Sequence, residues 1–200
     1  MDDVINTLQS YESFAYEYAE SRKDDNVAHY CRWIIKALAS ISGDSEIFEI
    51  GSGPGLYADY FESQGYSIVR SDGAQSFVDM SHARGVAMAK FDVVADVFAQ
   101  SYDAVLAINV MQHLKKDEAI VAFGKIYAAL NQRGRFIFTI TIGDGNSEIH
   151  NRQTGGYYFL NWPVESLRQA LVAAGFSIIS MQEVGYKNWM NIVVEKPDER

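Results

Sequence analysis

The sequence is poor in cysteine, repeats and long apolar runs, and each shortage excludes a class of protein. Cys31 is the only cysteine among 200 residues, so no disulfide can form within the chain and a cytoplasmic location is expected. No apolar run approaches the roughly 20 residues of a membrane span. No internal repeat, low-complexity stretch or linker interrupts the chain, and we expect residues 1–200 to form a single domain.

Basic residues are also scarce. Lys and Arg number 17 against 26 Asp and Glu, which gives a formal charge of −9, and the basic residues form no cluster. This balance opposes binding to nucleic acid or to an anionic membrane, because both need basic patches. The four histidines show no metal-ligand spacing with Cys31 or with acidic residues. We therefore expect a globular domain with no nucleic-acid, membrane or metal partner.

Short apolar runs alternate with helical patterns from residue 46 onward. This alternation predicts a mainly parallel sheet covered by helices on both faces. The expected strands are 46–50, 67–71, 85–89, 104–108 and 135–140, and the expected helices are 54–64, 74–84, 116–130 and 163–174.

The two ends of the chain depart from this alternation. The apolar runs 176–180 and 192–194 have no helix between them, so they are predicted to pair antiparallel. At the other end, helical spacing predicts one helix over residues 2–20 and a second from Val27 to Leu38. Residues 1–42 are therefore expected to form a helical leader.

A glycine-rich turn follows the first expected strand. Gly51, Gly53 and Gly55 stand between the apolar run Ile47–Ile50 and the next helix. Glycines let the backbone approach a ligand closely, and the helix N-terminus offers free N–H groups. The spacing is Gly-x-Gly-x-Gly, which differs from the Gly-x-Gly-x-x-Gly of dinucleotide-binding folds. A carboxylate, a phosphate or a ribose could bind to such a turn.

Asp72 ends the second expected strand, 21 residues after Gly51. A carboxylate in this place can accept hydrogen bonds from both ribose hydroxyls of a bound nucleoside. The alternative is a surface turn, because Ser71-Asp72-Gly73 also has good turn chemistry. The spacing from the glycine turn favours the ligand role.

The segment Glu49-Ile50-Gly51-Ser52-Gly53-Pro54-Gly55 resembles motif I of the class I S-adenosylmethionine-dependent methyltransferases. Three further segments are similar to that family in the same order: 102–114, which ends in His113-Leu114, then 130–138 and 173–176. Gln132-Arg133 stands where the family has Pro-Gly. The resemblance covers about residues 46–195, which we expect to form the cofactor-binding core.

The resemblance implies a fold and a set of cofactor contacts. The fold is an α/β, Rossmann-like, three-layer α/β/α sandwich with a seven-stranded, mainly parallel sheet and an antiparallel C-terminal hairpin strand. The cofactor is S-adenosyl-L-methionine, and the product is S-adenosyl-L-homocysteine. In the family an acidic residue at the position of Asp92 accepts the adenine amino hydrogen. The alternative is a solvated loop aspartate, and the placement of Asp72 slightly favours the adenine contact. The implied cofactor-binding residues are Glu49, Gly51, Ser52, Gly53, Gly55, Asp72, Asp92, Val93, Asn109 and Val110.

The methyl acceptor is expected to be a small molecule. The Asn-Pro-Pro-Tyr loop of amino-directed DNA methyltransferases and the Pro-Cys nucleophile of cytosine-C5 enzymes are both missing. In the family, the leader and the segment after the fifth strand, here 155–162, fold over the open side of the cofactor. Aromatic residues crowd both segments, and we expect them to form a mobile lid.

Three residues are predicted to act on the acceptor: His113 as a general base, with Tyr16 and Tyr158 in the lid. For His113 the alternative is a structural histidine that caps the next helix. Tyr11 is expected only to pack the leader on the core.

The expected reaction is an in-line displacement onto an O, N or S atom. Two rival functions remain open. One is a protein that binds S-adenosylmethionine without catalysis. The glycine turn and Asp72 would be the same in such a protein and in an enzyme, so they do not distinguish the two. The other is a different Rossmann-type enzyme, such as an NAD-dependent oxidoreductase or an aminopropyltransferase. The glycine spacing and the terminal hairpin argue against the oxidoreductase.

Overall fold

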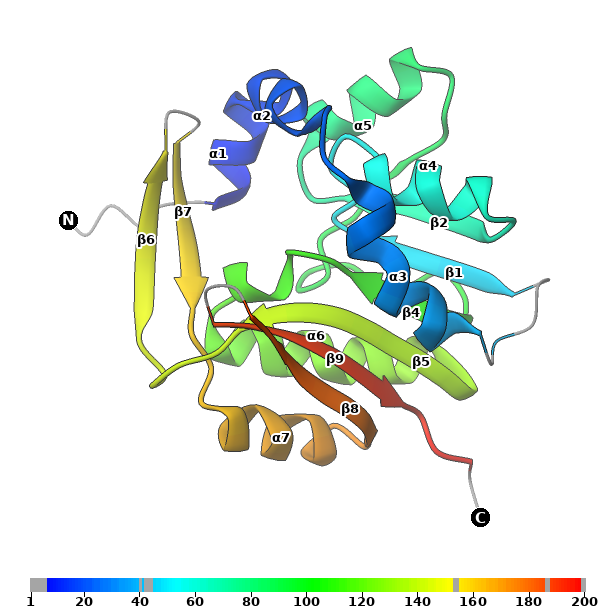
Figure 1. Cartoon of the computed structure of the whole chain (residues 1–200), viewed down its shortest axis with the longest axis vertical. Helices are drawn as coiled ribbons and strands as arrows, with labels where there is room; N and C mark the ends of the chain where they lie inside the picture. Colours follow the sequence, from blue (N-terminus) through cyan, green and yellow to red (C-terminus); the bar gives the residue numbers. More distant parts are fainter. Residues whose placement is uncertain (1–6, 40, 42–44, 153–154, 186–187, 199–200) are drawn as a thin grey trace.

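The computed structural model describes residues 7–39, 41, 45–152, 155–185 and 188–198, and it has a sheet between two layers of helices (Figure 1). The main sheet has seven strands in the order β3-β2-β1-β4-β5-β9-β8. Its strands are β1 (Glu46–Ile50), β2 (Ser67–Asp72), β3 (Ala89–Lys90), β4 (Tyr102–Ala107), β5 (Leu130–Thr141), β8 (Ser177–Val184) and β9 (Trp189–Glu195). The helices are α1 (Thr7–Ser13), α2 (Ala15–Arg22), α3 (Val27–Leu38), α4 (Leu56–Ser63), α5 (Gln75–Ala83), α6 (Lys116–Ala129) and α7 (Val164–Ala173).

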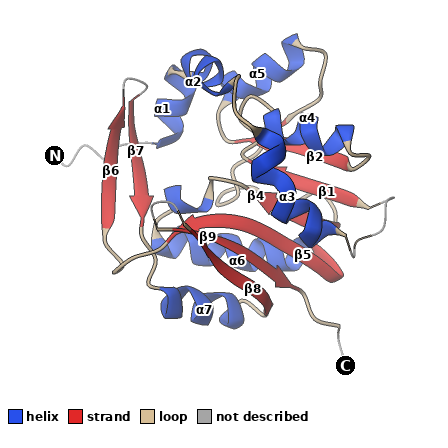
Figure 2. Ribbon diagram, in the orientation of Figure 1, coloured by secondary structure: helices blue, strands red, loops and turns tan. Residues whose placement is uncertain are grey.

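Alternate residues of the central strands build a core on each face of the sheet. Leu106 and Ile137 pack with α3 and α4 on one face, while Val105 and Phe136 pack with α6 and α7 on the other. All four side chains are fully buried. A strand that is apolar on both faces needs helices on both sides, and this requirement explains the three layers in Figure 2.

The C-terminal strands pair as the sequence predicts. β9 lies between β5 and β8 and runs antiparallel to both. The other neighbours in the sheet, from β3 through β5, are parallel. The structure thus has the predicted Rossmann-like α/β fold with one antiparallel strand near its edge.

The expected strand 85–89 is mostly absent, and only β3 at Ala89–Lys90 pairs with the sheet. The chain after α5 turns back onto that helix instead of extending. The N–H of Val86 donates to the Ser81 carbonyl over 3.0 Å, and the Ser81 hydroxyl donates to the Val86 carbonyl over 3.1 Å. These bonds occupy the backbone that a longer strand would have paired.

The leader differs from the predicted single helix over 2–20, of which residues 2–6 lie outside the described part of the chain. α1 and α2 are separated at Phe14, whose φ of −125° and ψ of 25° are not helical. α3 begins and ends where the sequence predicts, and the Asn26 side chain caps it by accepting from the His29 N–H over 3.2 Å. None of the helices in the described ranges is long and apolar enough to cross a membrane.

The aromatic segment after β5 is part of a hairpin rather than a loop. β6 (Ser147–Arg152) and β7 (Gly155–Leu160) form a separate two-stranded sheet, which stands beside α1 in Figure 1. Two hydrogen bonds join the hairpin to α1: Ser10 Oγ donates to the Gly156 carbonyl over 2.7 Å, and the Tyr158 N–H donates to Thr7 Oγ1 over 2.9 Å. Trp162, expected in the lid, is 1% exposed and belongs to the main core.

Candidate active site

The glycine turn between β1 and α4 forms the floor of a cavity. Gly51, Gly53 and Gly55 have φ angles of 69°, 54° and 88°, a region that side chains rarely allow. A Cβ atom on Gly51 would lie 2.5 Å from Val110 Cγ2, whereas one on Gly53 would meet no atom within 4 Å. Gly51 therefore serves close packing, and Gly53 leaves open space beside the cavity.

Asp72 joins the end of β2 to this turn. Its Oδ2 accepts from the Gly53 N–H over 2.8 Å, and its Oδ1 accepts from the Ala74 N–H over 2.7 Å. The side chain is 6% exposed, and burial raises the pKa of the carboxyl to about 6. These bonds fix the carboxylate at the cavity wall, where each oxygen keeps a further lone pair for a ligand.

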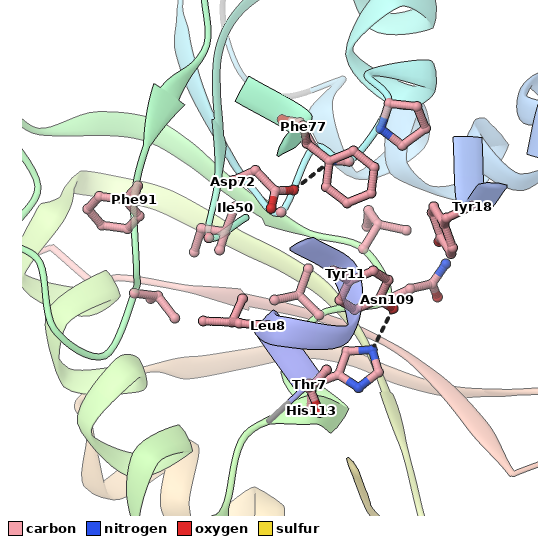
Figure 3. Close-up of a pocket in the computed structure, with 18 of the residues that line it drawn as sticks. Thr7, Leu8, Tyr11, Tyr18, Ile50, Asp72, Phe77, Phe91, Asn109 and His113 are labelled. Atoms are coloured by element: carbon pink, nitrogen blue, oxygen red, sulfur yellow. Dashed lines mark hydrogen bonds between the residues drawn. The ribbon is translucent and has the colours of Figure 1, made fainter. Parts of the chain in front are cut away.

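The first cavity lies between α1, the glycine turn and the ends of β2 and β4 (Figure 3). Most of the cofactor-binding residues predicted from the sequence line it: Gly51, Ser52, Gly53, Asp72, Asp92, Val93, Asn109 and Val110. The ends of neighbouring parallel strands meet at this edge of the sheet, and therefore residues far apart in the sequence gather here.

Glu49 and Gly55 lie outside this lining. Glu49 is 1% exposed, its Oε2 has no hydrogen-bond partner among the described residues, and burial raises the pKa of its carboxyl to about 7. A Cβ on Gly55 would come within 2.8 Å of Arg70 Nη1 and 3.3 Å of Arg84 Nη1. Gly55 thus makes room for two guanidinium groups rather than for a ligand.

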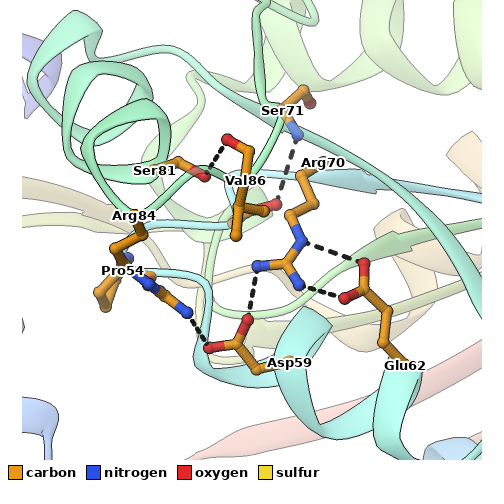
Figure 4. Close-up of polar contacts among 9 residues, drawn as sticks. Pro54, Asp59, Glu62, Arg70, Ser71, Ser81, Arg84 and Val86 are labelled. Carbon is orange, nitrogen blue, oxygen red and sulfur yellow. Dashed lines mark hydrogen bonds and ion pairs between the residues drawn. The ribbon is translucent and has the colours of Figure 1, made fainter.

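Those guanidinium groups tie the turn to α4 and β2 (Figure 4). Arg70 donates from Nη1 to Asp59 over 2.7 Å and from Nη2 to Glu62 over 2.6 Å, with its side chain 2% exposed. Arg84 donates to Asp59 over 2.5 Å and to the Pro54 carbonyl over 2.7 Å. The network holds the helix start, and with it the turn, against the second strand.

Arg70→Met is expected to lower the free energy of unfolding by about 2–3 kcal/mol, the scale for losing hydrogen bonds to charged groups. The two carboxylates that lose their partner are partly exposed and stay hydrated, which limits the loss. Arg84→Met is the matched control, because the Arg84 side chain is 41% exposed, and it should cost less than about 1 kcal/mol. Urea denaturation measures the free energy of unfolding of both variants. Equal losses would contradict the expectation that the buried arginine contributes more stability than the exposed one.

Two loop residues at the cavity are held by local hydrogen bonds. Asp92 Oδ1 accepts from the Val94 N–H over 2.9 Å, so this carboxylate also closes its own turn. Asn109 adopts a φ of 59°, which Asn tolerates better than most residues. Its N–H donates to Thr139 Oγ1 over 2.8 Å. Both residues are positioned before any ligand arrives.

His113 is the centre of a hydrogen-bonded chain. Its Nδ1 lies 2.8 Å from the Tyr158 carbonyl oxygen, which can only accept, so Nδ1 carries the hydrogen. In the neutral ring Nε2 is then an acceptor, and the Tyr11 hydroxyl donates to it over 3.1 Å. Figure 3 shows Tyr11 above the His113 ring, with the hydrogen bond between them as a dashed line. One proton can therefore pass from the Tyr11 hydroxyl to His113 Nε2 along this hydrogen bond.

A second cavity adjoins the first. The residues that line both are Tyr11, Tyr18, Arg22, Tyr57, Ile108, Asn109 and His113. The rest of the second cavity is lined mainly by α3, the hairpin and β9, with Gln112, Thr139 and Val184. Tyr157 of the hairpin packs on Tyr11 with ring centroids 4.7 Å apart. The two cavities therefore meet along a shared wall that includes the Tyr11–His113 pair.

The structure separates the residues predicted to act on an acceptor. His113 lines both cavities. Tyr16 is 71% exposed and lines neither cavity. Tyr158 also lines neither and contributes its carbonyl and N–H groups instead. Tyr11, which was expected only to pack the leader on the core, instead lines both cavities, where Tyr16 was expected to act. The one sequence signal for Tyr11 was its place on the apolar stripe of the leader, which predicts that it faces inward.

The comparisons with known proteins agree with this geometry. The sequence matches the family of methyltransferase domains over residues 18–181. No curated protein matches the sequence. The sheet order and the placement of the cavity define the class I methyltransferase fold, whose cofactor is S-adenosylmethionine. The chain belongs to the methyltransferase-domain family.

Several solved structures share the fold. One is 1,6-didemethyltoxoflavin-N1-methyltransferase from Burkholderia thailandensis, solved with 1,6-didemethyltoxoflavin and S-adenosylhomocysteine; it is 18% identical, with a TM-score of 0.73 over 96% of this chain and 87% of that one. Another is CalS10 from Micromonospora echinaspora, an amino pentose methyltransferase solved with S-adenosylmethionine; it is 15% identical, with a TM-score of 0.70 over 90% and 96%. The CcbJ methyltransferase from Streptomyces caelestis is 12% identical, with a TM-score of 0.75 over 96% and 100%. At these identities the likeness concerns the fold.

The residues of the first cavity fit the family cofactor. The Asp72 carboxylate keeps acceptor capacity at the cavity wall, and the space beside Gly53 is open. Both features suit a nucleoside that donates hydroxyl hydrogens and lies close to the backbone.

Proposed function

We propose that this protein transfers the methyl group of S-adenosylmethionine, bound in the first cavity, to a small molecule bound in the second. The observation that carries the proposal is the junction of the two cavities at Tyr11, Asn109 and His113. A methyl group can pass between two ligands only where they are in contact, at about 3–3.5 Å. Two of the solved structures named above are methyltransferases whose names give a small molecule, 1,6-didemethyltoxoflavin and an amino pentose, which supports the same acceptor class here.

The first cavity offers a contact for each part of the cofactor. Asp72 would accept the ribose hydroxyl hydrogens, and Asp92 with Val93 would meet the adenine. The backbone of Gly51, Ser52 and Gly53 would lie along the rest of the cofactor, and Asn109 and Val110 would lie beside its sulfonium. When bound, the cofactor supplies a methyl carbon that is already activated for in-line displacement.

Two residues named from the sequence take a supporting part in this proposal. Glu49 stands behind the turn, and Gly55 admits the two arginines that hold it. Neither touches the cavity, so each acts on the cofactor through the shape of the turn.

The acceptor is attacked through one of its own lone pairs on N, O or S. If that atom carries a hydrogen, the proton passes to the Tyr11 oxygen while the Tyr11 proton moves to His113 Nε2. The resulting imidazolium keeps its Nδ1–H bond to the Tyr158 carbonyl. The leader and the hairpin, which are joined by two hydrogen bonds, cover this junction and exclude water.

The rival function is a binding protein that keeps the cofactor without using it. A screen of small-molecule acceptors with methyl-labelled S-adenosylmethionine separates the two, because only an enzyme transfers label at a rate that depends on the acceptor. A protein that binds S-adenosylhomocysteine and transfers no label to any acceptor would support the rival. Tight binding of NAD without S-adenosylhomocysteine would instead support an oxidoreductase.

Asp72→Asn is expected to weaken S-adenosylhomocysteine binding about 10- to 100-fold, the loss that follows when hydrogen bonds to a charged group are removed. The exchange keeps the shape of the side chain. Isothermal titration calorimetry measures the affinity, and NAD should not compete. Equal affinities would contradict the ribose contact.

The pH profile of the same affinity is the second readout. Only the ionised carboxylate accepts from both hydroxyls, and burial raises the pKa of Asp72 to about 6. Affinity should therefore rise as the pH increases through 6 and level off above it. The pKa of Glu49 is also raised, to about 7, so the difference between the wild-type and Asp72→Asn profiles isolates Asp72.

A further inference from the structure

Gln112 carries a buried polar atom that the protein leaves without a partner. It stands in the short 3₁₀ helix η1 (Met111–His113), directly before His113, and is 1% exposed. Three buried side-chain atoms lack a hydrogen-bond partner among the described residues: Glu49 Oε2, Gln112 Oε1 and Trp162 Nε1. Of these residues only Gln112 lines one of the two cavities, and it lines the second. An unpaired buried carbonyl oxygen is costly, and Gln112 Oε1 is almost inaccessible in the structure without a ligand, so a turn of the side chain toward a ligand donor in the cavity would pair it and add affinity.

We propose that the second cavity binds a neutral, planar ring compound that donates an N–H or O–H hydrogen bond to Gln112 Oε1. The inference rests on the proposed function, because it names the acceptor class of the same site. It goes further in assigning recognition to a residue that neither the sequence motifs nor the proton path uses.

The walls of the second cavity support a planar ring. Tyr30 and Trp33 of α3, Tyr57 of α4, Tyr157 and Phe159 of the hairpin and Trp189 of β9 all line it. Aromatic side chains gain energy from offset-stacked or edge-to-face contacts with another ring, so these walls favour a flat aromatic ligand. The cavity volume of about 680 Å³ lies within the ~300–1,000 Å³ that is usual for small-molecule sites.

The charges around the cavity favour a neutral ligand. Among the residues that the structure describes, no Asp, Glu or Lys lines the second cavity, so neither an ammonium group nor a carboxylate has a dedicated partner in that part of the wall. Arg22 is the one arginine among the described lining residues, and it is already paired with Asp25 over 2.6 Å. An anionic acceptor would compete with Asp25 for that guanidinium. A cationic acceptor would lie next to it without a counter-charge.

Gln112 also sets where such a ring lies. Gln112, His113 and Tyr11 all line the second cavity, so a ring that donates to Gln112 would share this cavity with the Tyr11–His113 pair. Recognition and methyl transfer would then take place in one cavity. A polar group that is left unpaired by the wrong ligand is an effective basis for selection.

The test uses two probes of equal shape, indole and 1-benzofuran, which differ in one ring N–H donor. The full-length protein is saturated with S-adenosylhomocysteine, and the affinity of each probe is measured by ligand-observed NMR titration. Indole should bind at least tenfold more tightly than 1-benzofuran to the wild type. In Gln112→Leu this ratio should fall to within about twofold, with the affinity for 1-benzofuran kept or improved.

Gln169→Leu is the control, because it makes the same exchange on the exposed side of α7 and should keep the wild-type ratio. Benzyltrimethylammonium tests the cationic alternative. Equal binding of the two bicyclic probes, tighter binding of the ammonium probe or no binding of either ring compound would each overturn the proposal. So would a wild-type ratio that survives in Gln112→Leu.

Failure of the proposed function can be told apart from failure of this inference. Calorimetry with S-adenosylhomocysteine alone tests the first cavity. If the nucleoside does not bind, the proposed function fails, while the probe ratio in the nucleoside-free protein still reports on Gln112. If the nucleoside binds and the probes are not distinguished, only the inference fails.

Discussion

Gly53→Val is expected to weaken S-adenosylhomocysteine binding by more than about 100-fold while the sheet stays folded. A Cβ at Gly53 meets no protein atom within 4 Å, so the added side chain enters open space and not the core. Gly53 lines the first cavity, where the ligand would need that space. Its N–H also donates to Asp72 Oδ2, and a displaced turn would move the carboxylate that is proposed to hold the ribose.

Backbone strain is the competing effect and needs its own control. Gly53 has a φ of 54°, and a β-branched residue in that region costs about 1–3 kcal/mol of stability. Gly65 follows α4 with a φ of 90°, and a Cβ there also meets no atom within 4 Å. It lines neither cavity. Gly65→Val should therefore lose similar stability and keep the affinity.

The two variants together separate ligand binding from folding. Circular dichroism and thermal unfolding measure how much stability the strain removes. Calorimetry measures the affinity for S-adenosylhomocysteine at a temperature where both variants are folded. If Gly53→Val unfolds globally while Gly65→Val does not, Gly53 serves the fold. If both variants bind like the wild type, the ligand does not approach the turn.

The sequence predicted the parts of the site that follow from local patterns. β1, the glycine turn and α4 appear where an apolar run, three glycines and a helical spacing indicate them. Asp72 could be placed because parallel strands end at a common edge, which turns a spacing in the chain into proximity in space. Such features depend on a few neighbouring residues and one rule of topology.

The hairpin could not be predicted in this way. β6 reads Ser-Glu-Ile-His-Asn-Arg and lacks the alternation of apolar and polar residues that marks a half-buried strand. Gly155 and Gly156 give its partner β7 the composition of a loop. β7 pairs with β6 and packs on α1, so its strand structure depends on contacts distant in the sequence.

The roles of Tyr11 and Gln112 were missed for related reasons. A single helix over 2–20 keeps Tyr11 on the apolar stripe and Tyr16 off it, which suggested packing for the first and function for the second. The break at Phe14 ends that phase before Tyr16. Packing and function are also not exclusive, because the Tyr11 ring packs against Tyr157 while its hydroxyl reaches His113. For Gln112, no local pattern reports that a buried atom lacks a partner.

Tyr11→Phe is expected to lower the kcat of methyl transfer about 10²- to 10³-fold for an acceptor that must lose a proton from oxygen or nitrogen. The exchange removes the hydroxyl that donates to His113 Nε2 and keeps the ring that packs against Tyr157. Proton transfer by a positioned group contributes this much to typical enzyme rates. The acceptor is the first compound that the labelled-methyl screen identifies.

Three readouts separate a proton path from a structural role. S-adenosylhomocysteine affinity should change less than about threefold in Tyr11→Phe, and the loss should fall on kcat rather than on KM. The double variant Tyr11→Phe/His113→Gln should be no slower than His113→Gln alone, because the two residues act on one proton. Simple addition of the two losses would show instead that they act separately.

Tyr16→Phe is the matched control on the same leader. Tyr16 was the catalytic candidate from the sequence, yet its side chain is 71% exposed and lines neither cavity. This variant should keep kcat within about twofold of the wild type. The opposite outcome, a slow Tyr16→Phe and an unaffected Tyr11→Phe, would mean that the leader rearranges before catalysis and brings Tyr16 to the junction. Because α1 is tied to the hairpin through Ser10 and Thr7, we expect the two parts of the lid to move together and to hold Tyr11 at the junction during methyl transfer.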